Sequence, residues 1–325
     1  MVATLKELLE KQKFLLKNLQ VEKQHCQSDN KALSKRIQVV TTESRHRTKD
    51  IEQLRKRGVD TLVMLLKGEK VKNISKKIQQ LQQDIHTLAS SLLEQCDTDV
   101  ATKAFSIFWL NLKEPIAAMG DPLPLKRILT LTEKFMMDVL VDLFILNENP
   151  GFNIQEKYHQ LSVWIYDNAT DPEDTYLGGL LRQEIARICD RCRKDKTSDL
   201  YQTHCEVLQN KWKYMYSGLV KAFPFVYQND KAEPDIKKHY GARVHSLVEQ
   251  AIDIGMSIRS QAMDIYAVAV EEGTQALDTG MMLDVDGHTS GTIALCIFPP
   301  ILASAPISSD VDTSLVLAVG RMLCI

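Results

Sequence analysis

The first 57 residues contain neither Pro nor Gly, the residues that most often end a helix. Positions spaced alternately four and three residues apart form a seam that is apolar at ten of fifteen places, between residues that are mostly Lys, Glu, Gln and Arg. This heptad spacing predicts a coiled coil or docking along another helix. A straight 55-residue helix is about 80 Å long, too long for one compact domain. The seam residues are Leu5, Leu9, Gln12, Leu16, Leu19, Lys23, Cys26, Asn30, Leu33, Ile37, Val40, Ser44, Arg47, Ile51 and Leu54.

A second heptad run follows two glycines, Gly58 and Gly68, at which we expect the first helix to break. The spacing predicts an interaction seam formed by Ile74, Ile78, Leu81, Ile85, Leu88 and Leu92. The second helix could fold back along the first as a hairpin, or both seams could pair between chains. The sequence leaves this choice open.

The sequence as a whole predicts a mainly α protein. It has a coiled-coil or helical arm over residues 1–96 and a bundle of about five helices over 98–272. We expect helices near residues 99–112, 125–146, 154–166, 172–194 and 199–223, and a last one from after Pro234 to about Val270. Residues 274–325 form a small β module packed on the bundle. In it, Thr292–Phe298 and Ser314–Val319 are β-branched and apolar, and predict a two-stranded hairpin.

Charge is unevenly distributed: residues 1–96 carry a net charge of +8 and the rest −10. The densest basic cluster supplies candidate phosphate contacts, which would suit a regulatory protein that binds nucleic acid. Glu43, Asp50 and Glu52 interleave with this cluster inside the heptad run, which favours a salt-bridged coiled-coil flank instead. The candidate phosphate contacts are Arg45, Arg47, Arg55, Lys56 and Arg57.

Four residues, Cys189, Cys192, His204 and Cys205, have ligand types suited to zinc. Cys189 and Cys192 fall on the apolar face of a predicted helix, where cysteine packs as a small hydrophobic residue, so core packing is favoured over a metal site. Phosphate-binding loops and nucleophile–base motifs are absent, and the stretch from Asp284 to His288 predicts a turn. We therefore predict no cofactor, no metal and no catalytic residue.

The N-terminus lacks the apolar region of a signal peptide, and no uninterrupted apolar run is long enough for a membrane helix. Seven scattered cysteines without an export signal indicate reduced thiols. An intracellular location, cytoplasmic or nuclear, with no membrane contact is expected.

The C-terminal third resembles a group of uncharacterised filamentous-fungal helical proteins that end in a short β-hairpin. The resemblance covers roughly residues 240–325 and is carried by the helix Val244–Met263, the segment Met256–Gln261, and the strands Leu295–Pro299 and Leu315–Cys324. The chain departs from that pattern at Asp264–Gly273, where an Ala/Val-rich continuation replaces an aromatic, Pro-containing stretch. The resemblance implies a fungal intracellular protein and no assigned activity.

Taken together, these patterns favour a non-enzymatic interaction, scaffold or oligomerisation protein that acts through coiled-coil helices, binding a protein partner or itself. A nucleic-acid-associated regulator that uses the basic arm is the main alternative, and an enzyme without a recognisable motif is the third.

Overall fold

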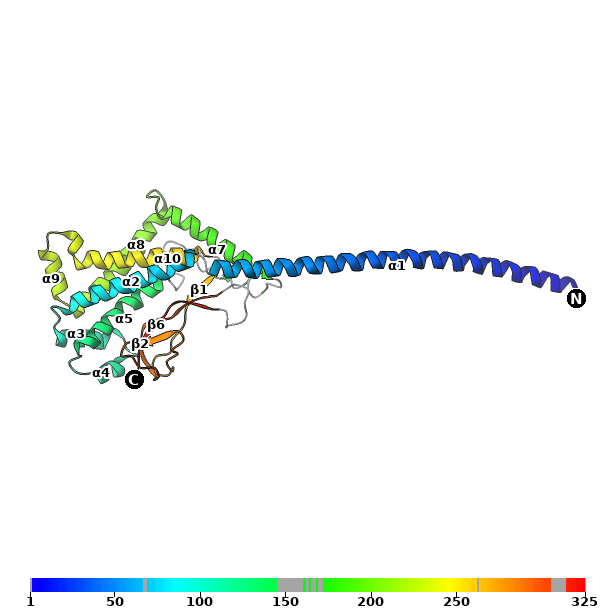
Figure 1. The fold of residues 1–325 in the computed structure, drawn as a ribbon. Helices are drawn as coiled ribbons and strands as arrows, with labels where there is room; N and C mark the ends of the chain where they lie inside the picture. The colour runs from blue at the N-terminus through cyan, green and yellow to red at the C-terminus, as the bar shows by residue number, and fades with distance from the viewer. Residues whose placement is uncertain are drawn as a thin grey trace. The chain divides into compact units, whose positions relative to one another are not determined.

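The computed structural model describes residues 2–66, 69–144, 172–261, 263–304 and 314–324, together with residues 160, 161, 164 and 168. The chain divides into two compact units, Met1–Met64 and Leu65–Ile325 (Figure 1). Helices dominate the described residues and a small set of strands lies near the C-terminus, which confirms the mainly α prediction. The division falls before the second heptad run, whereas the sequence places the arm's end at residue 96.

The first unit is one helix, α1 (Val2–Leu66). The expected break at Gly58 is wrong, because the helix continues through it for two further turns. A single glycine in a helix costs only about 1 kcal/mol relative to alanine, which the flanking helix-forming residues can offset.

The second unit contains a helical body. It begins with α2 (Glu69–Leu93). The next helix, α3, is capped at its N-terminus by the Asp97 carboxylate, which accepts hydrogen bonds from the backbone N–H groups of Asp99 and Val100. The other helices are α3 (Thr98–Phe108), α4 (Lys113–Ala118), α5 (Leu125–Phe144), α7 (Pro172–Cys192), α8 (Asp199–Ala222), α9 (Phe225–Ala232) and α10 (Tyr240–Arg259), with a 3₁₀ turn at Ile236–Lys238.

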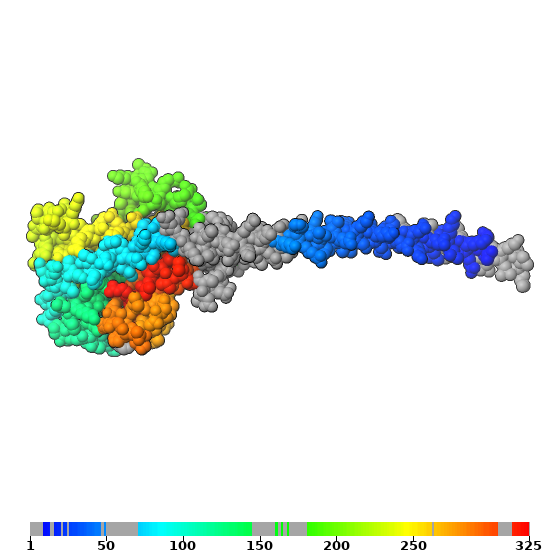
Figure 2. Space-filling view, in the orientation of Figure 1, coloured from blue at the N-terminus to red at the C-terminus, as the bar shows by residue number. Residues whose placement is uncertain are grey.

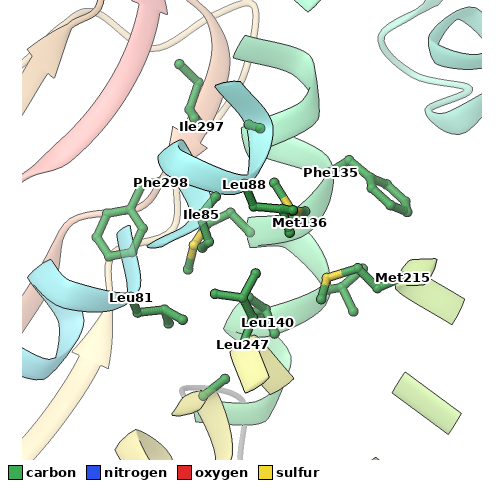
Figure 3. Close-up of a cluster of buried hydrophobic side chains, with 14 of the residues drawn as sticks. Leu81, Ile85, Leu88, Phe135, Met136, Leu140, Met215, Leu247, Ile297 and Phe298 are labelled. Atoms are coloured by element: carbon green, nitrogen blue, oxygen red, sulfur yellow. The ribbon is translucent and has the colours of Figure 1, made fainter. Parts of the chain in front are cut away.

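The seam of α2, predicted as an interaction seam within or between chains, is buried inside this body. Leu81 and Ile78 are fully buried, and α2 packs on α5 and α10. In Figure 3, Leu81 and Leu88 share a cluster with Leu140 of α5 and Leu247 of α10. Heptad spacing reports only that a helix has a narrow apolar stripe, and here the chain's own helices cover that stripe. The buried seam is Ile74, Ile78, Leu81, Ile85, Leu88 and Leu92.

Two helix ends differ from those expected. The helix expected near residues 99–112 ends at Phe108, and Pro115 lies in the first turn of the separate helix α4, where its missing N–H group is not needed. The last long helix ends at Arg259 instead of near Val270, and Asp264–Ala267 forms the strand β1. The expected helix over residues 154–166 lies largely outside the described residues.

The C-terminal strands form two three-stranded sheets, so the prediction of one two-stranded hairpin is wrong. β3 (Ile293–Phe298) pairs with β6 (Gly320–Cys324), which also pairs in parallel with β2 (Met282–Asp284). β4 (Ile301–Ser304) pairs with β1 and with β5 (Leu315–Ala318). The two predicted partners, β3 and β5, therefore belong to different sheets.

The sheets are tied to the body by both apolar and polar contacts. The hydroxyl of Ser75 on α2 donates a hydrogen bond of 2.7 Å to the backbone carbonyl of Leu317 on β5. The C-terminal strands (red) lie against α2 (cyan) in Figure 2. Leu295, Ile297 and Leu323 join the same buried cluster as the helices, as expected for a β module packed on the bundle.

The predicted turn at Asp284 to His288 is confirmed. The buried Asp284 carboxylate accepts hydrogen bonds from the backbone N–H groups of Asp286, His288 and Cys324. Asp286 in turn forms ion pairs of 2.6 Å with Arg127 and Lys126 at the start of α5. Hydrogen bonds from Arg127 and Lys126 lower the pKa of Asp286 to about 2.

Because Asp286 forms these two ion pairs, we expect the protein to lose stability in acid. A carboxyl whose folded pKa is below its unfolded value of about 3.9 stabilises the fold above that value, and the contribution disappears as the pH falls towards 2. Because Lys126 is exposed, we expect Asp286→Asn to lower the free energy of unfolding by only about 1 kcal/mol at pH 7. Urea titrations at pH 7, 4 and 3 should show this deficit shrinking below pH 4. Glu206→Gln, an exposed carboxylate on α8, is the control, and a deficit independent of pH would contradict the assignment.

Candidate functional site

The first candidate site is the seam of α1, whose apolar side chains face solvent. From Leu9 to Ser44, all eleven seam positions with described side chains are exposed. The apolar members range from 52% exposed at Leu9 to 64% at Ile37. Helices in proteins gain most of their stability from packing an apolar face against other elements. The 65-residue helix α1 therefore leaves an apolar stripe uncovered along its described length.

The basic cluster lies on the same helix. Arg45 and His46 are exposed, next to the equally exposed Glu43. The side chains of Arg47, Arg55, Lys56 and Arg57 lie outside the described residues. Of the five candidate phosphate contacts, Arg45 alone has a described side chain, so phosphate binding by this cluster stays a prediction.

The zinc candidates lie on two consecutive helices. Cys189 and Cys192 are in the last turn of α7, and His204 and Cys205 are in the first turns of α8. Cys189 is buried and its thiol donates a hydrogen bond to the carbonyl of Ile185, while Cys205 is exposed. Burial raises the pKa of the Cys189 thiol to about 11, which opposes the thiolate form that binds zinc. Within the described ranges, no three His, Cys, Asp or Glu side chains gather as metal ligands would.

We accordingly expect the purified protein to contain no stoichiometric zinc. The physical reason is that Cys189 fills a buried position as a protonated thiol. Elemental analysis of the full chain, expressed with added zinc, checks this prediction. One zinc per chain that disappears in Cys192→Ser would contradict it.

A groove of about 750 Å³ opens between α3, α5 and α8. Its floor is aromatic, with the rings of Phe108 and Phe135 only 4.8 Å apart, and Asp138 and Asp142 are its acidic groups. Both carboxylates already have partners. The indole N–H of Trp109 donates to Asp138 at 2.8 Å, and ion pairs join Lys134 to Asp138 and Lys211 to Asp142. The two carboxylates of the groove are therefore already paired with protein groups.

Two adjacent charged residues of α5, Glu133 and Lys134, are buried, and sequence reasoning missed them. Glu133 is paired with His86 of α2 at 2.5 Å and with Arg321 of β6 at 3.0 Å. Lys134 is paired with Glu272 at 2.9 Å, and donates to the carbonyl of Cys296.

These pairs connect helices to sheets. Burial alone would lower the pKa of Lys134, but the neighbouring carboxylates of Asp138 and Glu272 raise it, which keeps the ammonium charged. Burial also raises the pKa of the adjacent Cys296 thiol to about 12, which suppresses any thiolate nucleophile there. The signal in the sequence was the occurrence of two charges inside an otherwise apolar helix. Because Glu133 and Lys134 each have charged or polar partners on other segments of the chain, we assign them a structural role.

Comparison of the chain with known protein families, curated proteins and solved structures gives no match. The resemblance to filamentous-fungal proteins stays a prediction. Across the part of the chain that the structure describes, no helix is both long enough and apolar enough to cross a bilayer.

Proposed function

We propose that this protein is a non-enzymatic interaction and oligomerisation protein, in which α1 forms a coiled coil and the second unit is the folded body attached to it. One observation carries the proposal: the apolar seam of α1 is exposed along its described length, whereas the seam of α2 is buried within the body. Of the two heptad runs, only the α1 run leaves a surface for another molecule.

The exposed apolar area of the α1 seam supports association on energetic grounds. Each leucine or isoleucine that moves from water into a coiled-coil seam contributes about 1.5–3 kcal/mol at full burial. Leu9, Leu16, Leu19, Leu33 and Ile37 are all at least half exposed. Burial of all of this exposed surface on two helices contributes about 9–17 kcal/mol. That is comparable to the roughly 8 kcal/mol of micromolar binding together with the cost of holding two chains together, about 4 kcal/mol or more.

Neighbouring valines provide a matched experiment. Val40 lies on the seam and Val39 beside it on the outer face, and both are 57% exposed in the same turn. We expect the full chain to sediment as an oligomer at micromolar concentration, Val40→Asp to weaken association at least about tenfold, and Val39→Asp to leave it unchanged.

The measurement is sedimentation velocity over a range of concentrations, with circular dichroism as a check on folding. A strict monomer at tens of micromolar, with helicity independent of concentration, would argue against oligomerisation. Equal effects of the two valine substitutions would show that the seam is not the contact surface.

A further inference from the structure

We infer that the molecule occupying the α1 seam is α1 of a second copy, paired parallel and in register as a two-stranded coiled coil. This inference rests on the proposed function and adds the identity, direction and alignment of the partner helix. Its basis is the position of the polar residues within the seam, because those residues determine which pairings bury a charge without a polar neighbour.

The seam consists of two alternating heptad positions, a and d. Leu9, Leu16, Lys23, Asn30 and Ile37 occupy consecutive a positions. In a parallel in-register pair, every seam residue faces the same residue of the second copy. Each of the ten apolar residues then faces an apolar residue, and each of the five polar residues faces a polar one.

Antiparallel pairing places each a residue opposite a d residue instead. Two antiparallel alignments use nearly the whole seam. In the first, Lys23 faces Val40 and Asn30 faces Leu33; in the second, Lys23 faces Leu33. Both alignments place Lys23 opposite an apolar side chain. Unless the lysine leaves the seam, burying this charge in both copies costs several kcal/mol of association free energy.

Asn30 is the seam residue that most strongly favours one alignment of the two helices. An asparagine at an a position hydrogen-bonds to its counterpart across a parallel dimer. A shift of one heptad separates the two amides and leaves one opposite Ile37 and the other opposite Lys23. This arrangement lowers stability but selects two strands and one alignment. On α1 the Asn30 side chain is exposed and so is available for that contact.

Lys23 fits the same arrangement. Its counterpart in the second copy carries the same charge, but the long stem of a lysine lets the ammonium leave the seam. In a parallel pair the residue flanking each a position is at position g of the other helix, which here is Glu22 of the second copy. Glu22 and Lys23 are both exposed on α1, so the two ammonium groups each have a carboxylate within reach across the pair.

Cys26, at a d position between Lys23 and Asn30, gives a direct test. In a parallel in-register pair the two Cys26 residues face each other within the Cα separation that a disulfide spans. The thiol is exposed on α1, as is the thiol of Cys205, so the experiment uses a Cys205→Ser background. Diamide accepts the two electrons and two protons that two thiols lose on forming a disulfide, and peptide mass spectrometry identifies the linked residues.

A second cysteine distinguishes the two directions. With Ile37→Cys added, a parallel in-register pair gives links of residue 26 to 26 and of 37 to 37. The first antiparallel alignment gives a link of residue 26 to residue 37. This disulfide cannot form within one chain, because eleven residues of straight helix separate the two cysteines by about 16 Å.

Two matched asparagines test the register. Asn30 lies on the seam and Asn18 on the outer face of the same helix. We expect Asn30→Leu to raise the melting temperature of the oligomer and to allow species larger than a dimer, and Asn18→Leu to do neither.

The outcomes separate the inference from the proposed function. A dimer by sedimentation with 26–26 and 37–37 links supports both. A dimer with 26–37 links, or one without a 26–26 link, overturns the parallel in-register arrangement and leaves coiled-coil association standing. A trimer or larger assembly of the unsubstituted chain overturns the two-stranded arrangement. A monomer with no links at any concentration overturns both.

Discussion

Leu81→Asp is expected to unfold the second unit of the protein. Leu81 has no exposed surface and lies in the cluster that α2 forms with α5 and α10. The substitution removes a buried leucine and places a carboxylate among apolar side chains, which together should cost more than about 4 kcal/mol. Because whole domains are stable by about 5–15 kcal/mol, the urea midpoint should fall steeply or the cooperative transition should disappear.

Leu33→Asp is the matched control, because Leu33 occupies a seam position of α1 and is more than half exposed. It should leave the unfolding transition of the second unit unchanged while weakening association. Near-ultraviolet circular dichroism reports the packing of the second unit, whose tryptophans Trp109 and Trp212 lie against the core. If Leu81→Asp left that signal and the transition intact, α2 would not be a core helix.

Deletion of residues 312–325 is expected to produce insoluble protein or protein that binds the dye ANS. The deletion removes β6, the central strand of one sheet, and β5, an edge strand of the other. β3 and β2 would lose their only common partner strand, and the backbone groups of β3 that bond to β6 would be left unpaired. Leu295 and Ile297, now almost fully buried, would lose part of their cover.

Point substitutions in β6 and β5 test whether the effect of the deletion comes from lost packing and not from the shorter chain. Leu323 in β6 is 2% exposed, whereas Leu315 in β5 is 43% exposed. Leu323→Asp should lower the free energy of unfolding by several kcal/mol and Leu315→Asp by less than about 1. Thermal unfolding and size-exclusion chromatography provide the readout. A soluble, monodisperse deletion variant with unchanged heat resistance would show that these strands are not part of the fold's core.

The positions of buried charges illustrate what sequence patterns cannot provide. Glu133 and Lys134 look like surface residues that interrupt an apolar helix, because hydropathy treats every charge as exposed. Their partners, Arg321 and Glu272, are more than a hundred residues away in the sequence. A pair with that separation leaves no periodic signal, and the charges come together because β6 and the segment between β1 and β2 pack near α5.

The sequence by itself determined the local structure of this protein: the helical character of residues 2–57 and 69–93, the apolar stripe on each, the turn at Asp284, and a strand-forming C-terminus. These features depend on residues a few positions apart, so propensity and periodicity are sufficient to find them. The tertiary structure decided which stripe is buried and which is left exposed, because α1 and α2 both have heptad spacing and this spacing does not say what packs on either helix. It likewise decided strand pairing, since β3 and β5 have similar apolar sequences, and contacts between segments distant in the chain place them in different sheets.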